Sequence, residues 1–463
     1  MTYSECVSYL SDLGHELGHV KFDLETIRLI LADLSDPQRS YPTAIVAGTN
    51  GKGSTCAMLS QILHCAGFRT GLYTSPHLVR VNERIRLAGD EICDADFAAV
   101  STAVRERAER LFERGLLKGR PSLFEFLTAM AFLHFAREAV DFVVLEVGMG
   151  GRLDAANVTE PRVAVITNVE LDHEEFLGRT RAAIAAEKAG VIRAGRPVIS
   201  GCEDEETAQV VRRRADDLGA EWIDLPRRSC VSNVCGRNGF FTFDLELDGD
   251  RFAGLAPSLA GKVQIKNATA AVAAARFLKR EGMNISLASV REGLLTARWP
   301  GRLEAIHDRP RVLLDGAHNP AAARELARFV MEQLAGRRVR LVYASMRDKE
   351  IGEISQALFP LAVEVYLTRT GTARSAAPEE IFERAACAPE KIVIQPDPVL
   401  AVQAACRASS EDDVVLVAGS LFLVGAIEEA RREGRLEIGA SFGNGDLTVA
   451  ANLGRSRGTC KER

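Results

Sequence analysis

The sequence predicts an α/β protein: a P-loop domain with a doubly wound, mainly parallel sheet, followed by a smaller Rossmann-like C-terminal domain. Short apolar runs alternate with helical patterns along most of the 463 residues, as in βαβ units. One run, at 43–47, breaks into a glycine-rich turn ahead of a helix. A breaker cluster at 299–301 precedes a second α/β rhythm, and the chain is too long for one ordinary core.

The elements of the first domain follow from apolar periodicity and from turn residues. A helical pattern covers about 13–35, and a break in the α/β rhythm at 228–256 indicates a β-rich flap. The other expected elements are strands at 43–47, 69–74, 142–147 and 163–167, a hairpin at 83–92, and helices at 56–66, 94–115, 122–138, 265–280 and 286–296.

The second domain is expected to hold strands at 312–315, 339–344, 363–368, 391–394 and 414–418. We therefore expect one domain over 1–298 and a second over 299–436, which the family resemblance described below implies are an ATP-binding domain and a ligase domain. Residues 437–463 are rich in Gly, Ser and Asn with little periodicity, which predicts a disordered tail.

Composition limits the classes of partner. The net charge of -5 argues against a general nucleic-acid binder, and no apolar run approaches the ~20 residues that span a bilayer. Residues 1–12 lack a secretory signal pattern. Ten cysteines without C-x-x-C pairs fit reduced thiols. We expect a cytoplasmic monomer that binds small molecules, and neither nucleic acid nor membranes.

The turn after the first strand predicts a phosphate site formed by Gly51, Lys52, Gly53 and Ser54. Backbone N–H groups and the helix dipole converge there, and the lysine adds a positive charge. The usual phosphate-loop pattern is not strictly met, because Val46 replaces a glycine and Gly53 replaces a hydroxyl residue. The alternative is a plain glycine-rich turn with a solvated lysine.

Polar residues at other strand ends predict a metal site. Ser75, Glu146 and His173 each stand at or just beyond the carboxyl end of a predicted strand, the edge where α/β sheets bind ligands. Hydroxyl, carboxylate, imidazole and phosphate ligands suit Mg²⁺, with Mn²⁺ tolerated. The alternative for Glu146 is a structural salt bridge. Spacing alone leaves Lys188 a solvated helix lysine.

A series of ordered motifs resembles the folylpolyglutamate synthase and dihydrofolate synthase family of Mur-type ligases, in its bacterial bifunctional type. The resemblance covers roughly residues 13–430. Its motifs are 47–55, 74–78 with 83–85, 145–154, 171–173, 187–190, 300–302, 315–320, 346–349 and 419–421.

The resemblance implies a role for each of the matching residues. Gly51, Lys52, Gly53 and Ser54 would hold ATP phosphates, and Ser75, Glu146 and His173 would bind magnesium. Asn267, Arg302 and Asp315 would contact the nucleotide. Lys188 matches a lysine that is carbamylated in the family, and Phe124, Glu125, Arg152 and Leu153 match positions that line the pterin site.

The implied reaction is ATP-dependent addition of L-glutamate to a folate-type carboxylate, dihydropteroate or tetrahydrofolate, through an acyl phosphate. Lys52 and Mg²⁺ would offset phosphoryl charge, and Lys188 would assist at the metal site. His318 is a candidate base, with helix capping as its alternative role. The alternatives to this reaction are the activity of a different Mur-type amide ligase, that of a P-loop small-molecule kinase, and the role of a nucleotide-dependent switch or scaffold.

Overall fold

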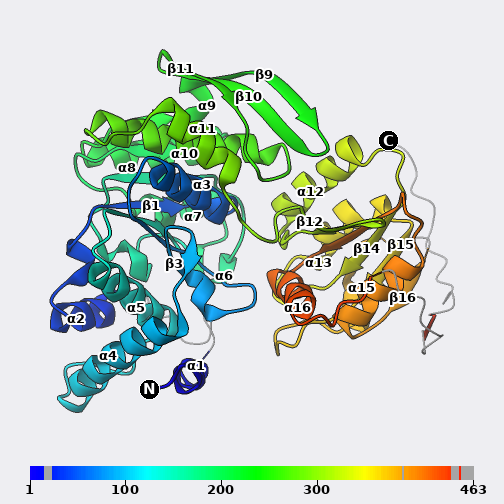
Figure 1. Cartoon of the computed structure of the whole chain (residues 1–463), viewed down its shortest axis with the longest axis horizontal. Helices are drawn as coiled ribbons and strands as arrows, with labels where there is room; N and C mark the ends of the chain where they lie inside the picture. Colours follow the sequence, from blue (N-terminus) through cyan, green and yellow to red (C-terminus); the bar gives the residue numbers. More distant parts are fainter. Residues whose placement is uncertain (15–22, 388–390, 439–447, 450–463) are drawn as a thin grey trace. The chain divides into compact units, whose positions relative to one another are not determined.

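A computed structural model describes residues 1–14, 23–387, 391–438 and 448–449. The chain divides into two compact units, Met1–Pro300 and Gly301–Arg463 (Figure 1). The sequence placed this boundary two residues earlier, after residue 298. None of the helices within the described part of the chain is long and apolar enough to cross a membrane.

The first unit is built on an eight-stranded sheet in the order β4-β3-β2-β5-β1-β6-β7-β8. The six strands from β2 to β8 in this order run parallel, whereas β3 and β4 form the expected hairpin. The mainly parallel α/β fold is thus confirmed. The strands are β1 Thr43–Ala47, β2 Thr70–Tyr73, β3 Ile85–Leu87, β4 Asp90–Glu91, β5 Phe142–Glu146, β6 Val163–Ile166, β7 Val198–Ser200 and β8 Trp222–Asp224.

Helices cover both faces of this sheet (Figure 1). Ile45 and Ala47 of β1 face the core formed with α1, α2, α4, α5, α7 and α8, whereas Ala44 and Val46 face the core formed with α3, α10 and α11. The helices are α1 Tyr3–Asp12, α2 Glu25–Asp33, α3 Lys52–Cys65, α4 Asp94–Glu113, α5 Leu123–Arg137, α6 Glu174–Leu177, α7 Arg181–Ala189, α8 Glu205–Asp217, α9 Leu225–Arg228, α10 Val263–Arg280 and α11 Leu287–Thr296. Short 3-10 turns are η1 Pro37–Arg39, η2 Val81–Arg84 and η3 Ala155–Val158.

The helical pattern expected over 13–35 corresponds only to α2, and residues 15–22 lie outside the described residues. A separate helix, α1, precedes it. Thr2 caps α1 by accepting a hydrogen bond from Glu5 N, and the Glu5 carboxylate accepts one from Thr2 N. This capping box is readable in the sequence and marks a helix start that apolar periodicity alone missed.

The expected flap at 228–256 is a three-stranded antiparallel sheet of β9 Ser229–Arg237, β10 Phe240–Leu247 and β11 Asp250–Leu255. Apolar side chains alternate along β10, so Phe243, Leu245 and Leu247 pack into the α10 and α11 core while the residues between them face outward.

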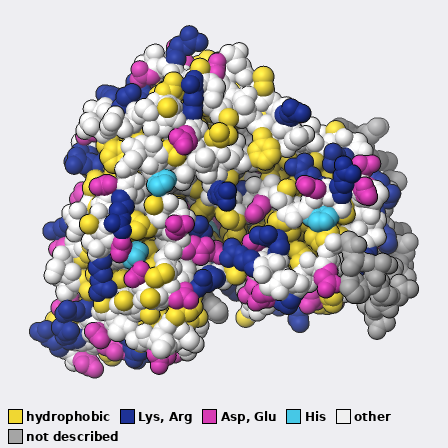
Figure 2. Space-filling model, in the orientation of Figure 1, with side chains coloured by type: hydrophobic (Ala, Val, Ile, Leu, Met, Phe, Trp, Pro, Cys, Tyr) yellow, Lys and Arg dark blue, Asp and Glu magenta, His cyan; other side chains and the backbone are white. Residues whose placement is uncertain are grey.

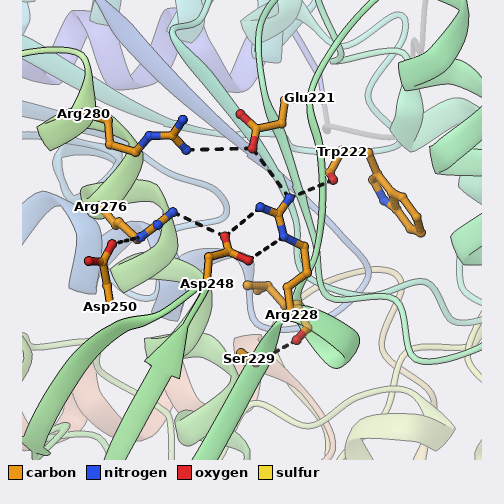
Figure 3. Close-up of polar contacts among 9 residues, drawn as sticks. Glu221, Trp222, Arg228, Ser229, Asp248, Asp250, Arg276 and Arg280 are labelled. Carbon is orange, nitrogen blue, oxygen red and sulfur yellow. Dashed lines mark hydrogen bonds and ion pairs between the residues drawn. The ribbon is translucent and has the colours of Figure 1, made fainter.

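An ion-pair network fastens the base of the flap to the main sheet and to α10 (Figure 3). Arg228 contacts both carboxylate oxygens of Asp248 at 2.7 Å, and Arg276 bridges Asp248 and Asp250. Glu221, beside β8, approaches Arg228 at 3.6 Å. The network joins three segments that are distant in sequence, at 221–228, 248–250 and 276. It therefore fixes the orientation of the flap within the first unit.

The second unit has its own sheet, in the order β12-β13-β17-β14-β15-β16-β18. The strands from β13 to β16 in this order are parallel, as expected, and β12 is an antiparallel edge strand that sequence reasoning missed. Its elements are β12 Glu304–Asp308, β13 Arg311–Leu314, α12 Pro320–Gln333, β14 Val339–Tyr343, α13 Ile351–Leu358, η4 Phe359–Leu361, β15 Glu364–Leu367, α14 Pro378–Arg384, β16 Ile392–Ile394, α15 Pro398–Arg407, β17 Val414–Ala418, α16 Leu421–Arg432 and β18 Thr448–Val449.

The disordered tail expected over 437–463 lies outside the described residues, except for 437–438 and β18. On the described surface, basic and acidic side chains are interspersed over the face shown in Figure 2, in line with the small net charge of -5.

Candidate active site

Strand order brings the candidate residues of the first unit together. In the sheet, β1 lies between β5 and β6, and Val46 pairs with both Glu146 and Val165. Because parallel strands lie ~5 Å apart, the loop after β1 is flanked by the ends of β5 and β6. The glycine-rich loop is therefore a neighbour of Glu146 on one side and of the 167–173 segment on the other.

The glycine-rich loop has the geometry of an anion cradle. Gly51 has a φ of 82° and directly precedes α3, which begins at Lys52. A side chain at Gly51 would collide with the Asn267 carboxamide of α10, so Asn267 lies directly against the loop. The Lys52 ammonium donates to the carbonyls of Gly48 at 2.9 Å and Thr49 at 3.2 Å. Ser54 is buried in the first turn of α3. Backbone N–H groups, a lysine and an amide thus converge here.

The segment after β6 holds the loop in shape. The Asn168 side-chain oxygen accepts hydrogen bonds from Thr49 N at 3.2 Å and from Asn50 N at 2.9 Å. The Thr167 hydroxyl donates to Asn50 O at 2.6 Å. Sequence reasoning assigned only His173 in this segment. Thr167 and Asn168 form a polar pair directly after a strand, and this was a signal of a role at the ligand-binding edge. The loop residues that they contact, however, lie more than a hundred residues away in the chain.

The candidate metal ligands lie on three separate segments around this edge. Glu146 is buried at the end of β5, and one carboxylate oxygen accepts a hydrogen bond from Ser75 N at 3.1 Å. His173 has a φ of 53° and lies within 4.0 Å of Asp172. The donor set of hydroxyl, carboxylate and imidazole suits a hard divalent cation. Within the described ranges no three His, Cys, Asp or Glu side chains form a metal-binding group, and Mg²⁺ does not need one, because substrate phosphates usually complete its shell.

Lys188 is not the solvated lysine that spacing suggested. Its side chain is only 3% exposed in the last turn of α7. Burial, together with the nearby charge of Lys52, lowers the pKa of Lys188 to about 7, whereas Asp172 acts in the opposite direction. A large fraction of this amine is therefore neutral near pH 7, next to the phosphate loop and the 171–173 segment.

The glycine-rich turn after β5 is organised by Asp154, a role that sequence reasoning missed. Its carboxylate accepts hydrogen bonds from the N–H groups of Gly148, Met149 and Ala156 at 2.9–3.1 Å. Burial raises the pKa of Asp154 to about 6 despite these hydrogen bonds. Asp154 therefore does not pair with Arg152, which was the structural alternative for that arginine. Arg152 instead contacts Glu187 at 2.9 Å and is half-exposed.

The start of α5 lies against this turn. A side chain at Gly148 would collide with the Phe124 ring, and Phe124 approaches Tyr73 with ring centroids 6.0 Å apart. Glu125 forms a capping box with Ser122 through one oxygen, while its other oxygen is buried and forms no hydrogen bond. Leu153 is half-buried in the same turn. Aromatic and polar groups are therefore close together beside the end of β5.

The candidate residues of the second unit also cluster. The half-buried Asp315 carboxylate accepts hydrogen bonds from Leu303 N at 3.0 Å and Ala317 N at 2.9 Å. Burial raises the pKa of Asp315, and the charge of Arg302 opposes that rise. The ring nitrogen Nδ1 of His318 lies 2.8 Å from Gly316 O. His318 does not cap α12, as the alternative role required, because Asn319 is the cap and accepts from Ala322 N at 2.9 Å.

Comparison with known proteins decides the family. Residues 46–275 match the Mur ligase middle domain, and residues 301–421 match the Mur ligase, glutamate ligase domain. The dihydrofolate synthase/folylpolyglutamate synthase of Bacillus subtilis is 33% identical over 89% of this chain and 95% of its own length. The enzyme of the same name from Escherichia coli is 33% identical over 92% of this chain and 96% of its own.

The chain belongs to the folylpolyglutamate synthase/dihydrofolate synthase family of Mur ligases. Solved structures of family members agree. E. coli FolC, in complex with DHPP and ADP, superposes with a TM-score of 0.83 at 31% identity, covering 94% of this chain and 100% of that one. The bifunctional folylpolyglutamate synthase/dihydrofolate synthase of Yersinia pestis, complexed with AMPPNP and Mn ion, gives 0.81 at 32% identity, covering 93% and 98%. As in these family members, a glutamate ligase domain follows the phosphate loop, whereas a P-loop kinase would leave residues 301–421 without a role.

Proposed function

We propose that this chain is an ATP-dependent ligase that joins the amine of L-glutamate to a folate-type carboxylate, with both dihydropteroate and tetrahydrofolate as acceptors. The observation that carries the proposal is the placement of the phosphate loop between Glu146 and the His173 segment in a chain of this family. ADP release that requires both a folate acid and glutamate tests it.

In the proposed reaction the folate carboxylate attacks the γ-phosphorus of ATP in line, which yields an acyl phosphate and ADP. The glutamate amine then attacks the acyl carbon, and phosphate leaves. The protein needs no nucleophilic side chain, because positioning and charge compensation lower both barriers. The N–H groups of Gly51, Lys52, Gly53 and Ser54 would bind the phosphates. The Lys52 ammonium would exchange its two contacts with neutral carbonyls for stronger ones with anionic phosphate oxygens.

Ser75, Glu146 and His173 would hold Mg²⁺, with Mn²⁺ tolerated. The metal would offset negative charge on the transferring phosphate. The buried Glu146 carboxylate at the sheet edge supports this assignment, since a hard cation stabilises a buried anion.

Glu146→Gln keeps the size of the side chain and an oxygen that can accept from Ser75 N, but it removes the charge. We expect the magnesium concentration for half-maximal activity to rise about tenfold or more, since even the loss of a hydrogen-bond partner of a metal ligand costs about 10- to 100-fold in affinity. The measurement is a Mg²⁺ titration at saturating ATP, with Glu160→Gln as the control because Glu160 is exposed. An unchanged titration would make Glu146 a structural ion-pair partner.

Lys188 is proposed to carry a carbamate that serves at the metal site. The support is its buried amine, whose pKa of about 7 leaves it able to attack CO₂ as the neutral form. The carbamate would replace a positive charge by a negative one beside Lys52, which removes a like-charge repulsion.

The pH dependence follows from the direction of this shift. Below pH ~7 the amine is protonated and cannot react, so carbamate should form readily at pH 8 and poorly at pH 6. We expect ¹³C-bicarbonate to give a carbamate NMR signal at pH 8 that Lys188→Ala abolishes, and acetate to restore part of that variant's activity. No carbamate signal together with no rescue would contradict the assignment.

The remaining proposed contacts complete the substrate sites. Asn267, Arg302 and Asp315 would bind the nucleotide, and His318 would accept a proton from the incoming glutamate ammonium. Phe124 would stack on the pterin, Glu125 would bind its polar edge through the oxygen that lacks a hydrogen bond, and Leu153 would line the pocket. Arg152 would orient the pteroate carboxylate, exchanging its exposed contact with Glu187.

We also propose a cytoplasmic monomer. The nine cysteines among the described residues are all free thiols, which favours a reducing compartment. One chain supplies every group in the proposed reaction. The interspersed surface charges and net charge of -5 support small-molecule substrates rather than nucleic acid.

A further inference from the structure

The residue after Lys52 is a glycine, where a phosphate loop usually has a hydroxyl residue. The structure supplies a reason. A Cβ atom at Gly53 would lie 2.6 Å from Cζ2 and 2.7 Å from Nε1 of Trp299. The indole of Trp299 therefore rests directly on the backbone of the first turn of α3, between Lys52 and Ser54, and only glycine leaves room for it.

Trp299 follows a segment that is itself fixed to α3. The preceding helix α11 packs on α3, where Gly293 lies against the backbone of Ile62. Ala297 N then donates to Gly293 O at 3.0 Å, and Ala297 O accepts a hydrogen bond from the Ser258 hydroxyl. The end of the first unit is thus attached to α3 at two places, one of which is the phosphate-loop turn.

The next residues belong to the second unit and are fixed there. Gly301 N donates to Glu304 at 2.8 Å, and Gly301 O accepts from Gly316 N at 2.9 Å. Arg302 follows at once, and its guanidinium lies against Gly316. Only Pro300 separates the residue held on the phosphate loop from the residue held in the second unit. Its ring fixes the φ angle of Pro300 near about −65° and restricts the backbone of Trp299, so few conformations are open to Trp299 where it meets Gly53.

We infer that Trp299 is a positioning residue that holds the first turn of α3, at Gly53, in the geometry that binds phosphate. The indole touches the turn whose N–H groups would bind ATP, and three positions later the chain presents a proposed nucleotide contact. The indole covers the backbone between Lys52 and Ser54, so it limits how far Gly53 can shift and holds the neighbouring N–H groups in the direction in which they would meet the phosphates. The inference rests on the proposed function, because it assigns ATP to this loop.

A fluorescence titration tests the contact without relying on catalysis. The chain has two tryptophans, and Trp222, on β8 under the guanidinium of Arg212, is remote from the loop in sequence and sheet order. In the Trp222→Phe protein, emission reports Trp299 alone. We expect Mg²⁺–ADP to change this emission with the same midpoint as ADP binding measured by calorimetry. Saturation by calorimetry with no change in emission would overturn the inference.

Kinetics separate positioning from simple packing. Trp299→Ala should lower kcat about 10- to 100-fold, as small misplacements of reacting groups do. The KM for ATP should change by no more than about threefold, because the loop keeps its own phosphate-binding groups. Trp299→Phe should keep most of the kcat that Trp299→Ala loses, since an aromatic ring still covers Gly53. Trp222→Ala, which removes an indole elsewhere, should leave kcat unchanged.

Wild-type kcat in Trp299→Ala would overturn the inference, as would a loss matched by Trp222→Ala. If Trp299→Ala does not fold, the emission titration decides, because it uses protein that retains Trp299. Failure of the proposed function is distinguishable: unmodified protein would then form no ADP with folate acid and glutamate. If that protein turns over but ADP does not change the emission of Trp299, the ligase assignment stands and the positioning role of Trp299 fails.

Discussion

Lys52→Ala is expected to lower kcat about 10²- to 10³-fold, the loss seen when one donor to developing transition-state charge is removed. Lys52 is the cation at the first residue of α3, and its ammonium already lies over the loop, within 2.9 Å of Gly48 O. Without it, charge that builds up on the transferring phosphoryl group is compensated only by backbone N–H groups and the metal. Turnover at saturating ATP and Mg²⁺ is the measurement.

The matched control is Lys118→Ala. Lys118 is 87% exposed and pairs with Glu25 at 2.8 Å, so its removal should leave turnover unchanged. Circular dichroism should show that both variants are folded, because Lys52 lies on a loop-to-helix turn rather than in the core. Near wild-type turnover by Lys52→Ala would mean that the glycine-rich turn does not bind the reacting phosphates.

Arg340→Met is expected to destabilise the second unit by about 3–5 kcal/mol, the cost of leaving buried charges without their partner. Arg340, on β14, contacts Glu364 at 3.3 Å and Asp413 at 2.6 Å, and all three side chains are buried. It also donates to the Ser409 hydroxyl at 3.2 Å. A urea titration followed by circular dichroism should show the transition of the second unit at lower denaturant.

Arg324→Met provides the comparison within the same unit. Arg324 pairs with Glu353 at 3.6 Å, but both side chains are more than half exposed, so its loss should cost less than about 1 kcal/mol. Equal midpoints for Arg340→Met and Arg324→Met would show that the Arg340 network contributes nothing beyond an ordinary surface pair.

Much of the fold was predictable because it depends on local patterns. The strands at 43–47, 142–147 and 163–167 are short apolar runs, and each ends in polar or glycine residues that mark the ligand-binding edge. That pattern alone placed Glu146 and the phosphate loop on one edge. The edge strand β12 was missed because its residues, Glu304–Asp308, are largely polar and partly exposed, so they carry no apolar run.

Other features of the site depend on which segments meet, and no local pattern encodes this. The Asn168 amide finds Thr49 and Asn50 only because β6 lies beside β1. Lys188 looks like any helix lysine until the fold buries it beside Lys52 and lowers its pKa. The indole of Trp299 explains Gly53 only once α11 and α3 are packed together. Family resemblance, rather than spacing, pointed to Lys188 and Asn267.

The central claim is the ligation of glutamate to a folate acid, and a coupled assay of ADP release tests it most directly. Purified protein is incubated with ATP, Mg²⁺ and L-glutamate, with dihydropteroate or tetrahydrofolate in separate wells. We expect ADP with each acid, and none when either the acid or glutamate is omitted. Activity with tetrahydrofolate alone would remove the dual specificity but keep the ligase. ADP release that is the same with and without glutamate would contradict the account, and so would the absence of ADP release with both acids.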